Sequence, residues 1–60
     1  MTHEEFVFER DLLRGNIARL CITEDMEELH KQYRIANTRI DNIYEYRMRI
    51  LTERAKHEDS

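Results

Sequence analysis

The sequence predicts an all-α fold, a helical hairpin in which a short N-terminal helix precedes a long C-terminal helix. Between residues 26 and 54, apolar residues recur at alternating steps of three and four, which is the spacing of an a/d seam on a helix. The chain has no proline and one glycine, and 38% of its residues are charged, against about 25% in average domains. We expect one helical domain over residues 1–60, with helices at about 3–14 and 24–56.

The first helix is expected to begin at His3, because Thr2 and Glu5 have the spacing of a capping box. A rival interpretation is a short strand over residues 5–10, since Phe-Val-Phe within it is a β-prone combination. A lone strand has no evident partner in this chain, so the helix is preferred.

Gly15 leaves two alternatives for the end of the first helix. The helix either stops at Arg14, because glycine often follows the last helical residue, or continues through the glycine to residue 21. The apolar phase then changes, and Thr23 has the chemistry of an N-cap for the second helix. We expect that helix to run to residue 56 and the tail 57–60 to fray.

The seam of the second helix predicts self-association. The first helix is at most about half as long, so it cannot cover the seam, and a second copy would do so by forming a four-helix bundle or coiled coil. A chain of sixty residues also forms only a marginal hydrophobic core by itself. The pattern leaves open whether paired chains run parallel or antiparallel. The predicted dimer or partner interface consists of Met26, Leu29, Tyr33, Ala36, Ile40, Ile43, Arg47, Ile50 and Arg54.

Arg47 and Arg54 are charged exceptions in this seam. A charge at a seam position costs stability unless it is paired, but it can specify register or partner. The two side chains either reach water from the helix end or meet acidic residues of a neighbouring helix, with Glu4, Glu5 and Glu9 as candidates.

The net charge of −3 conceals an uneven distribution. Residues 1–30 carry three Arg and eight Asp or Glu, whereas residues 31–57 carry seven Lys or Arg and three Asp or Glu. The simplest interpretation is that the acidic first helix packs beside the basic second one, in the same chain or in a partner chain. The alternative is a basic face that contacts phosphates, although the overall acidity argues against strong nucleic-acid binding. Candidates for an exposed or phosphate contact are Tyr46, Arg34, Arg39 and Arg49.

The sequence shows no catalytic or metal-binding arrangement. Its three histidines lie far apart, without the short spacing of metal ligands. Cys21 has no neighbouring residue that would activate its thiol, so we expect a buried, small apolar side chain. We predict neither a cofactor nor a membrane span, and a cytoplasmic location, where a lone thiol stays reduced.

The expected function is that of a small non-enzymatic protein that homodimerises and binds an unidentified protein partner, as a regulator or adaptor. The alternative is a nucleic-acid-binding regulatory factor that uses the basic face of the second helix.

Overall fold

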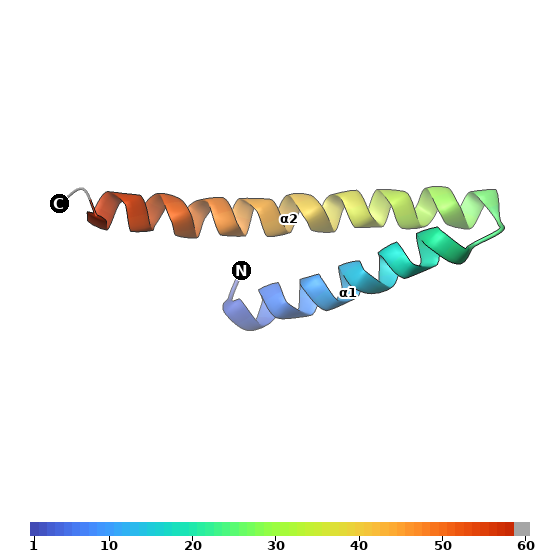
Figure 1. Cartoon of the computed structure of the whole chain (residues 1–60), viewed down its shortest axis with the longest axis horizontal. Coiled ribbons are helices and arrows are strands. Elements are labelled where there is room, and N and C mark those ends of the chain that lie inside the picture. Colours follow the sequence, from blue (N-terminus) through green and yellow to red (C-terminus); the bar gives the residue numbers. More distant parts are fainter. Residues whose placement is uncertain (59–60) are drawn as a thin grey trace.

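Two helices run antiparallel and form a hairpin (Figure 1). The computed structural model describes residues 1–58, in which α1 spans His3–Ile22 and α2 spans Met26–Glu58. This part of the chain contains no strand, so the predicted all-α class and the hairpin are confirmed. Of the tail expected to fray, residues 57 and 58 belong to α2, and residues 59 and 60 lie outside the described residues.

The predicted capping box opens α1. The Thr2 hydroxyl accepts a hydrogen bond from the backbone N–H of Glu5 at 3.1 Å. In return, the Thr2 backbone N–H donates to Oε1 of Glu5 at 3.4 Å. These two bonds satisfy backbone donors that no helical carbonyl can reach, and the segment 5–10 is therefore helical rather than extended.

α1 continues through Gly15, so the longer of the two alternatives holds and the helix extends to Ile22. The glycine does not have a positive φ, and a Cβ built on it would meet no atom within 4 Å. Glycine costs a helix interior about 1 kcal/mol relative to alanine. Nothing inside the hairpin requires its small size.

The turn between the helices spans residues 23–25. Thr23 closes α1, because its backbone N–H donates to the carbonyl oxygen of Arg19 at 2.9 Å. The Thr23 hydroxyl accepts from the N–H of Asp25 at 3.3 Å, and the Asp25 carbonyl accepts from Leu29 at 2.9 Å. Where we expected Thr23 to cap the second helix, Asp25 directly precedes α2. Asp and Thr are both favourable N-caps, so residue type alone could not separate them.

The hairpin has very little fully buried interior. Among the described residues, only Ala36 and Gln32 are fully buried, at 4% and 3% exposure. Larger apolar side chains between the helices are half-buried; they are Phe6, Val7, Leu12, Leu13, Leu20, Leu29, Ile35, Ile43 and Ile50. The contact between α1 and α2 therefore resembles a surface contact more than a protein core.

α2 is longer than the helix that covers it. At 1.5 Å per residue, the 20 residues of α1 span about 30 Å and the 33 residues of α2 about 50 Å. Near the start of α1, the Phe6 ring stacks on Tyr46 with ring centroids 5.0 Å apart. Beyond this stack the last turns of α2 extend past α1 without a neighbouring helix (Figure 1).

Candidate interaction surface

Polar side chains form a set of hydrogen bonds between the two helices. Arg39 on α2 donates from Nη1 to Oε1 of Glu9 at 3.0 Å and from Nε to Oδ1 of Asn16 at 3.0 Å. The Arg39 and Glu9 side chains are 24% and 21% exposed. Because Glu9 and Asn16 are two turns apart on α1, a single guanidinium fixes both the position and the rotation of that helix.

The same network continues toward the turn. Asn16 donates from Nδ2 to Oε1 of Gln32, and Gln32 donates from Nε2 to Oε1 of Glu28 at 2.8 Å. Glu28 also forms an ion pair with Arg19 on α1 at 3.7 Å. Most buried polar groups are hydrogen-bonded in folded proteins, so a network of this kind favours one alignment of the helices. The sequence alone does not single out Asn16 and Gln32, because each looks like an ordinary surface residue there. Glu9 was expected to meet Arg47 or Arg54 and pairs with Arg39 instead.

The large apolar side chains of α2 lie on its outside. We call this set the α2 stripe; the exposed fraction of its side chains runs from 47% at Ile40 to 65% at Met26. Its members recur at steps of three, four and seven, and so share one face of the helix. The α2 stripe consists of Met26, Tyr33, Ile40, Tyr44, Met48 and Leu51.

The predicted seam divides between this exposed face and the covered one. Leu29, Ala36, Ile43 and Ile50, the seam positions that repeat every seven residues, are half-buried or buried. The alternate positions, which are Met26, Tyr33, Ile40, Arg47 and Arg54, are exposed. Besides Leu29, Ala36, Ile43 and Ile50, α1 covers a neighbouring row of α2 residues that lies on the side away from the α2 stripe. This row consists of Gln32, Arg39 and Tyr46. The apolar side of α2 is thus wider than one helix can cover.

Arg47 and Arg54 form no ion pair within the described residues. Glu9, one of the acids considered as a partner for these arginines, is bound to Arg39 instead. Arg47 lies on the same face as Ile40 and Tyr44, where it interrupts the apolar character of the α2 stripe.

A shallow apolar hollow connects the α2 stripe to α1. It has a volume of about 320 Å³ and is lined by Leu20, Leu29, His30 and Tyr33. Ile17, 46% exposed, lies one turn before Leu20 on the same side of α1. The exposed apolar surface therefore includes both helices on this side of the hairpin.

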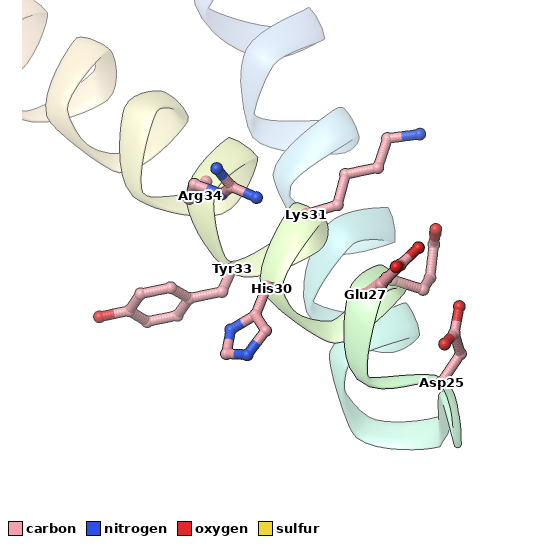
Figure 2. A pocket seen from close by; sticks show the side chains of 7 residues that line it. Asp25, Glu27, His30, Lys31, Tyr33 and Arg34 are labelled. Carbon is pink, nitrogen blue, oxygen red and sulfur yellow. The ribbon is translucent and has the colours of Figure 1, made fainter.

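A larger hollow, of about 840 Å³, lies over the first turns of α2. Figure 2 shows that its side chains diverge: His30 and Tyr33 point to one side of the helix, and Lys31 and Arg34 to another. Groups that diverge cannot hold one small ligand between them. The described residues also contain no group of three or more His, Cys, Asp or Glu placed to hold a metal ion.

The four candidate phosphate contacts do not form one surface. Arg39 is bound to Glu9 and Asn16, and Tyr46 is half-buried against Phe6. Arg34 and Arg49 are exposed. The hollow beside Arg49 also contains Glu45, whose negative charge opposes phosphate binding there.

Cys21 is exposed, which corrects the expectation of a buried thiol. Leu13, Asn16 and Leu20 form the side of α1 that lies toward α2. Cys21 follows Leu20 by one residue, about 100° further around the helix, and so points away from the contact.

The comparisons with known proteins give no relative. No family model, curated protein or solved structure matches the chain. Neither helix, within the described residues, carries an apolar segment long enough to cross a bilayer.

Proposed function

We propose that the protein is a non-enzymatic helical interaction module. It homodimerises through the α2 stripe, and the dimer binds a second protein as a small regulator or adaptor. The observation that carries this proposal is the distribution of residue types. Polar groups join the two helices, whereas six large apolar side chains of α2 face solvent.

Association would remove this apolar surface from water. Burial contributes roughly 25 cal/mol for each Å² of apolar surface, and among the described residues the hairpin alone leaves its larger apolar side chains half-buried at most. Two hairpins that join their α2 stripes would form a four-helix arrangement. The last turns of α2, which extend past α1, would then gain neighbours.

A second apolar surface lies on α1, outside the α2 stripe. Phe8 and Ile22 are 63% and 76% exposed. They lie seven residues before and after Gly15, so all three residues share one face of α1. An amphipathic helix of a partner protein could pack on this face, and the missing side chain at Gly15 would allow its backbone to approach closely.

Sedimentation velocity at micromolar concentration tests the dimer. We expect a dimer for the natural protein and a monomer for Ile40→Glu, which places a charge in the α2 stripe. Asn42→Glu is the matched control, because Asn42 is exposed on the opposite side of α2, and it should remain dimeric. A folded monomer of the natural protein at this concentration would contradict the proposal.

Affinity capture from the native source, followed by mass spectrometry, tests the protein partner. Phe8→Ser should lose the captured protein and keep the dimer, because Phe8 lies outside the α2 stripe. Capture that is identical for Phe8→Ser and the natural protein would remove α1 as the binding surface.

A further inference from the structure

Four of the six residues of the α2 stripe are placed symmetrically about Asn42, and Met26 and Met48 are not. Tyr33 and Leu51 lie nine residues before and after Asn42. Ile40 and Tyr44 lie two residues before and after the same position. We propose, on the basis of the homodimer above, that the two α2 helices pair antiparallel about a two-fold axis at the height of Asn42.

Antiparallel pairing about this axis matches four residues of the α2 stripe with apolar residues, whereas Met48 lies at the height of the buried Ala36 and Met26 at that of Glu58. A residue that lies a given number of positions before Asn42 then faces the residue that lies as many positions after it in the partner copy. Ile40 meets Tyr44 of the partner copy, and Tyr33 meets Leu51 of the partner copy. The two-fold axis makes each of these two pairs occur twice, once on either side of the axis, so the contact contains four apolar layers.

The same register also matches two polar residues on this face, whereas Arg54 falls opposite His30 of the partner copy. Asn37 and Arg47 lie five residues before and after Asn42. Each therefore faces the other across the axis, and the Asn37 amide oxygen can accept from the guanidinium of the partner copy. In a parallel pair Arg47 would face Arg47, and two like charges would oppose association.

The charges along α2 favour the same direction. Residues 24–28, at its start, include four acidic residues and no basic one. Residues 47–56, near its end, include four basic residues and one acidic residue. Antiparallel helices place the acidic start of one copy beside the basic end of the other, whereas parallel helices place like charges together. Complementary charge of this kind determines orientation more strongly than affinity.

The lengths of the helices fit the same register. α2 runs from Met26 to Glu58, so Asn42 is also its midpoint, and the two α2 helices would overlap along their whole length. The uncovered last turns of one α2 would lie beside the start of the partner's α2, close to the turn of that hairpin. Parallel pairing would leave both uncovered ends side by side.

Distances between spin labels in the full-length protein test the orientation. Cys21→Ser removes the one native thiol, and Asn42→Cys or Lys56→Cys provides a single site for the label. Both positions are exposed and outside the α2 stripe. Antiparallel pairing places the two labels at position 42 at the same height along the helices. The two labels at position 56 are then about 42 Å apart along them, at 1.5 Å per residue.

We therefore expect a pulsed dipolar spectrum with a much longer distance for the position-56 pair than for the position-42 pair. Similar distances at both positions, in samples that sediment as dimers, would overturn the antiparallel arrangement and leave the proposed dimer intact. Absence of dipolar coupling at both positions, in samples that sediment as monomers, would overturn the dimer as well.

Discussion

Arg39 and Glu9 join the two helices through an ion pair of 3.0 Å between residues thirty positions apart in the chain. The guanidinium also reaches Asn16, so one side chain contacts two separate turns of α1. The loss of Arg39 would leave the Glu9 carboxylate mostly buried and without its partner. For a mostly buried ion pair, removing one partner lowers the free energy of unfolding by more than the intact pair contributes to it through net attraction.

We expect Arg39→Ala to lower the free energy of unfolding by about 1–3 kcal/mol, because a charged group then loses its hydrogen bonds in a poorly solvated position. Urea unfolding followed by circular dichroism measures the change. Arg34→Ala, at an exposed position that lacks an ion pair within the described residues, is the control, with an expected change below about 0.5 kcal/mol. Equal effects of the two variants would show that the Arg39 network does not stabilise the hairpin.

Gly15→Ala should raise the free energy of unfolding by about 0.5–1 kcal/mol, because the helix gains propensity and the new methyl group meets no neighbour. Ala18→Gly, at another exposed position inside α1, should have the opposite effect of similar size. Thermal melts of both variants measure the difference. A loss of stability in Gly15→Ala would mean that another chain lies against the glycine in the assembled protein.

Arg47→Leu should raise the thermal stability and loosen the choice of partner. The substitution replaces a charge on the face of the α2 stripe with an apolar side chain and removes one device that specifies register. Melts at several protein concentrations measure the effect, with the exposed Arg49→Leu, off the stripe, as control. A large loss of stability in Arg47→Leu would show that the contact of Arg47 with a neighbouring chain outweighs the gain from an apolar side chain.

Asn37→Asp should tighten an antiparallel dimer. Each new carboxylate would face Arg47 of the partner copy, and the two pairs, at about 0.2–1 kcal/mol each, would lower the dissociation constant by roughly two- to thirtyfold. Asp41, four residues away in the same helix, repels the new carboxylate in the monomer and in the dimer alike, so this repulsion lowers helix stability by a few tenths of a kcal/mol without changing the dissociation constant.

Sedimentation equilibrium at low and high salt measures the Asn37→Asp effect, which should shrink at high salt because the new pairs are near the surface. Asn42→Asp adds the same charge outside the α2 stripe and should leave the dissociation constant unchanged. A weaker dimer in Asn37→Asp would favour parallel pairing, where the two new carboxylates would face and repel each other.

Local chemistry was sufficient to predict the helices but not all of their ends. Thr2 and Glu5 predicted the capping box because both bonds form within one turn. At Gly15 the local preference allowed two outcomes, and the continuing contact with α2 decides between them. Thr23 and Asp25 are both good N-caps. The position of the turn therefore depends on how the two helices pack, which the local sequence does not determine.

The contact between the helices was harder to predict than the helices themselves. Arg39 and Tyr46 follow predicted seam residues by three positions, and with Gln32 they repeat at the same interval of seven. The apolar side of α2 is wider than one helix, and periodicity alone cannot predict which edge of it α1 covers. The choice depends on complementary groups at distant positions, such as Glu9 and Asn16, whose pairing is visible only once the chain is folded.

The polar network inside the hairpin has a consequence for how this protein can change. Arg39, Asn16 and Gln32, together with the half-buried apolar side chains, join the two helices, and the exposed apolar residues take no part in this contact. In the proposed interaction module, specificity toward other molecules and the internal alignment of the hairpin would therefore depend on separate sets of residues, and each set could diversify with little cost to the other.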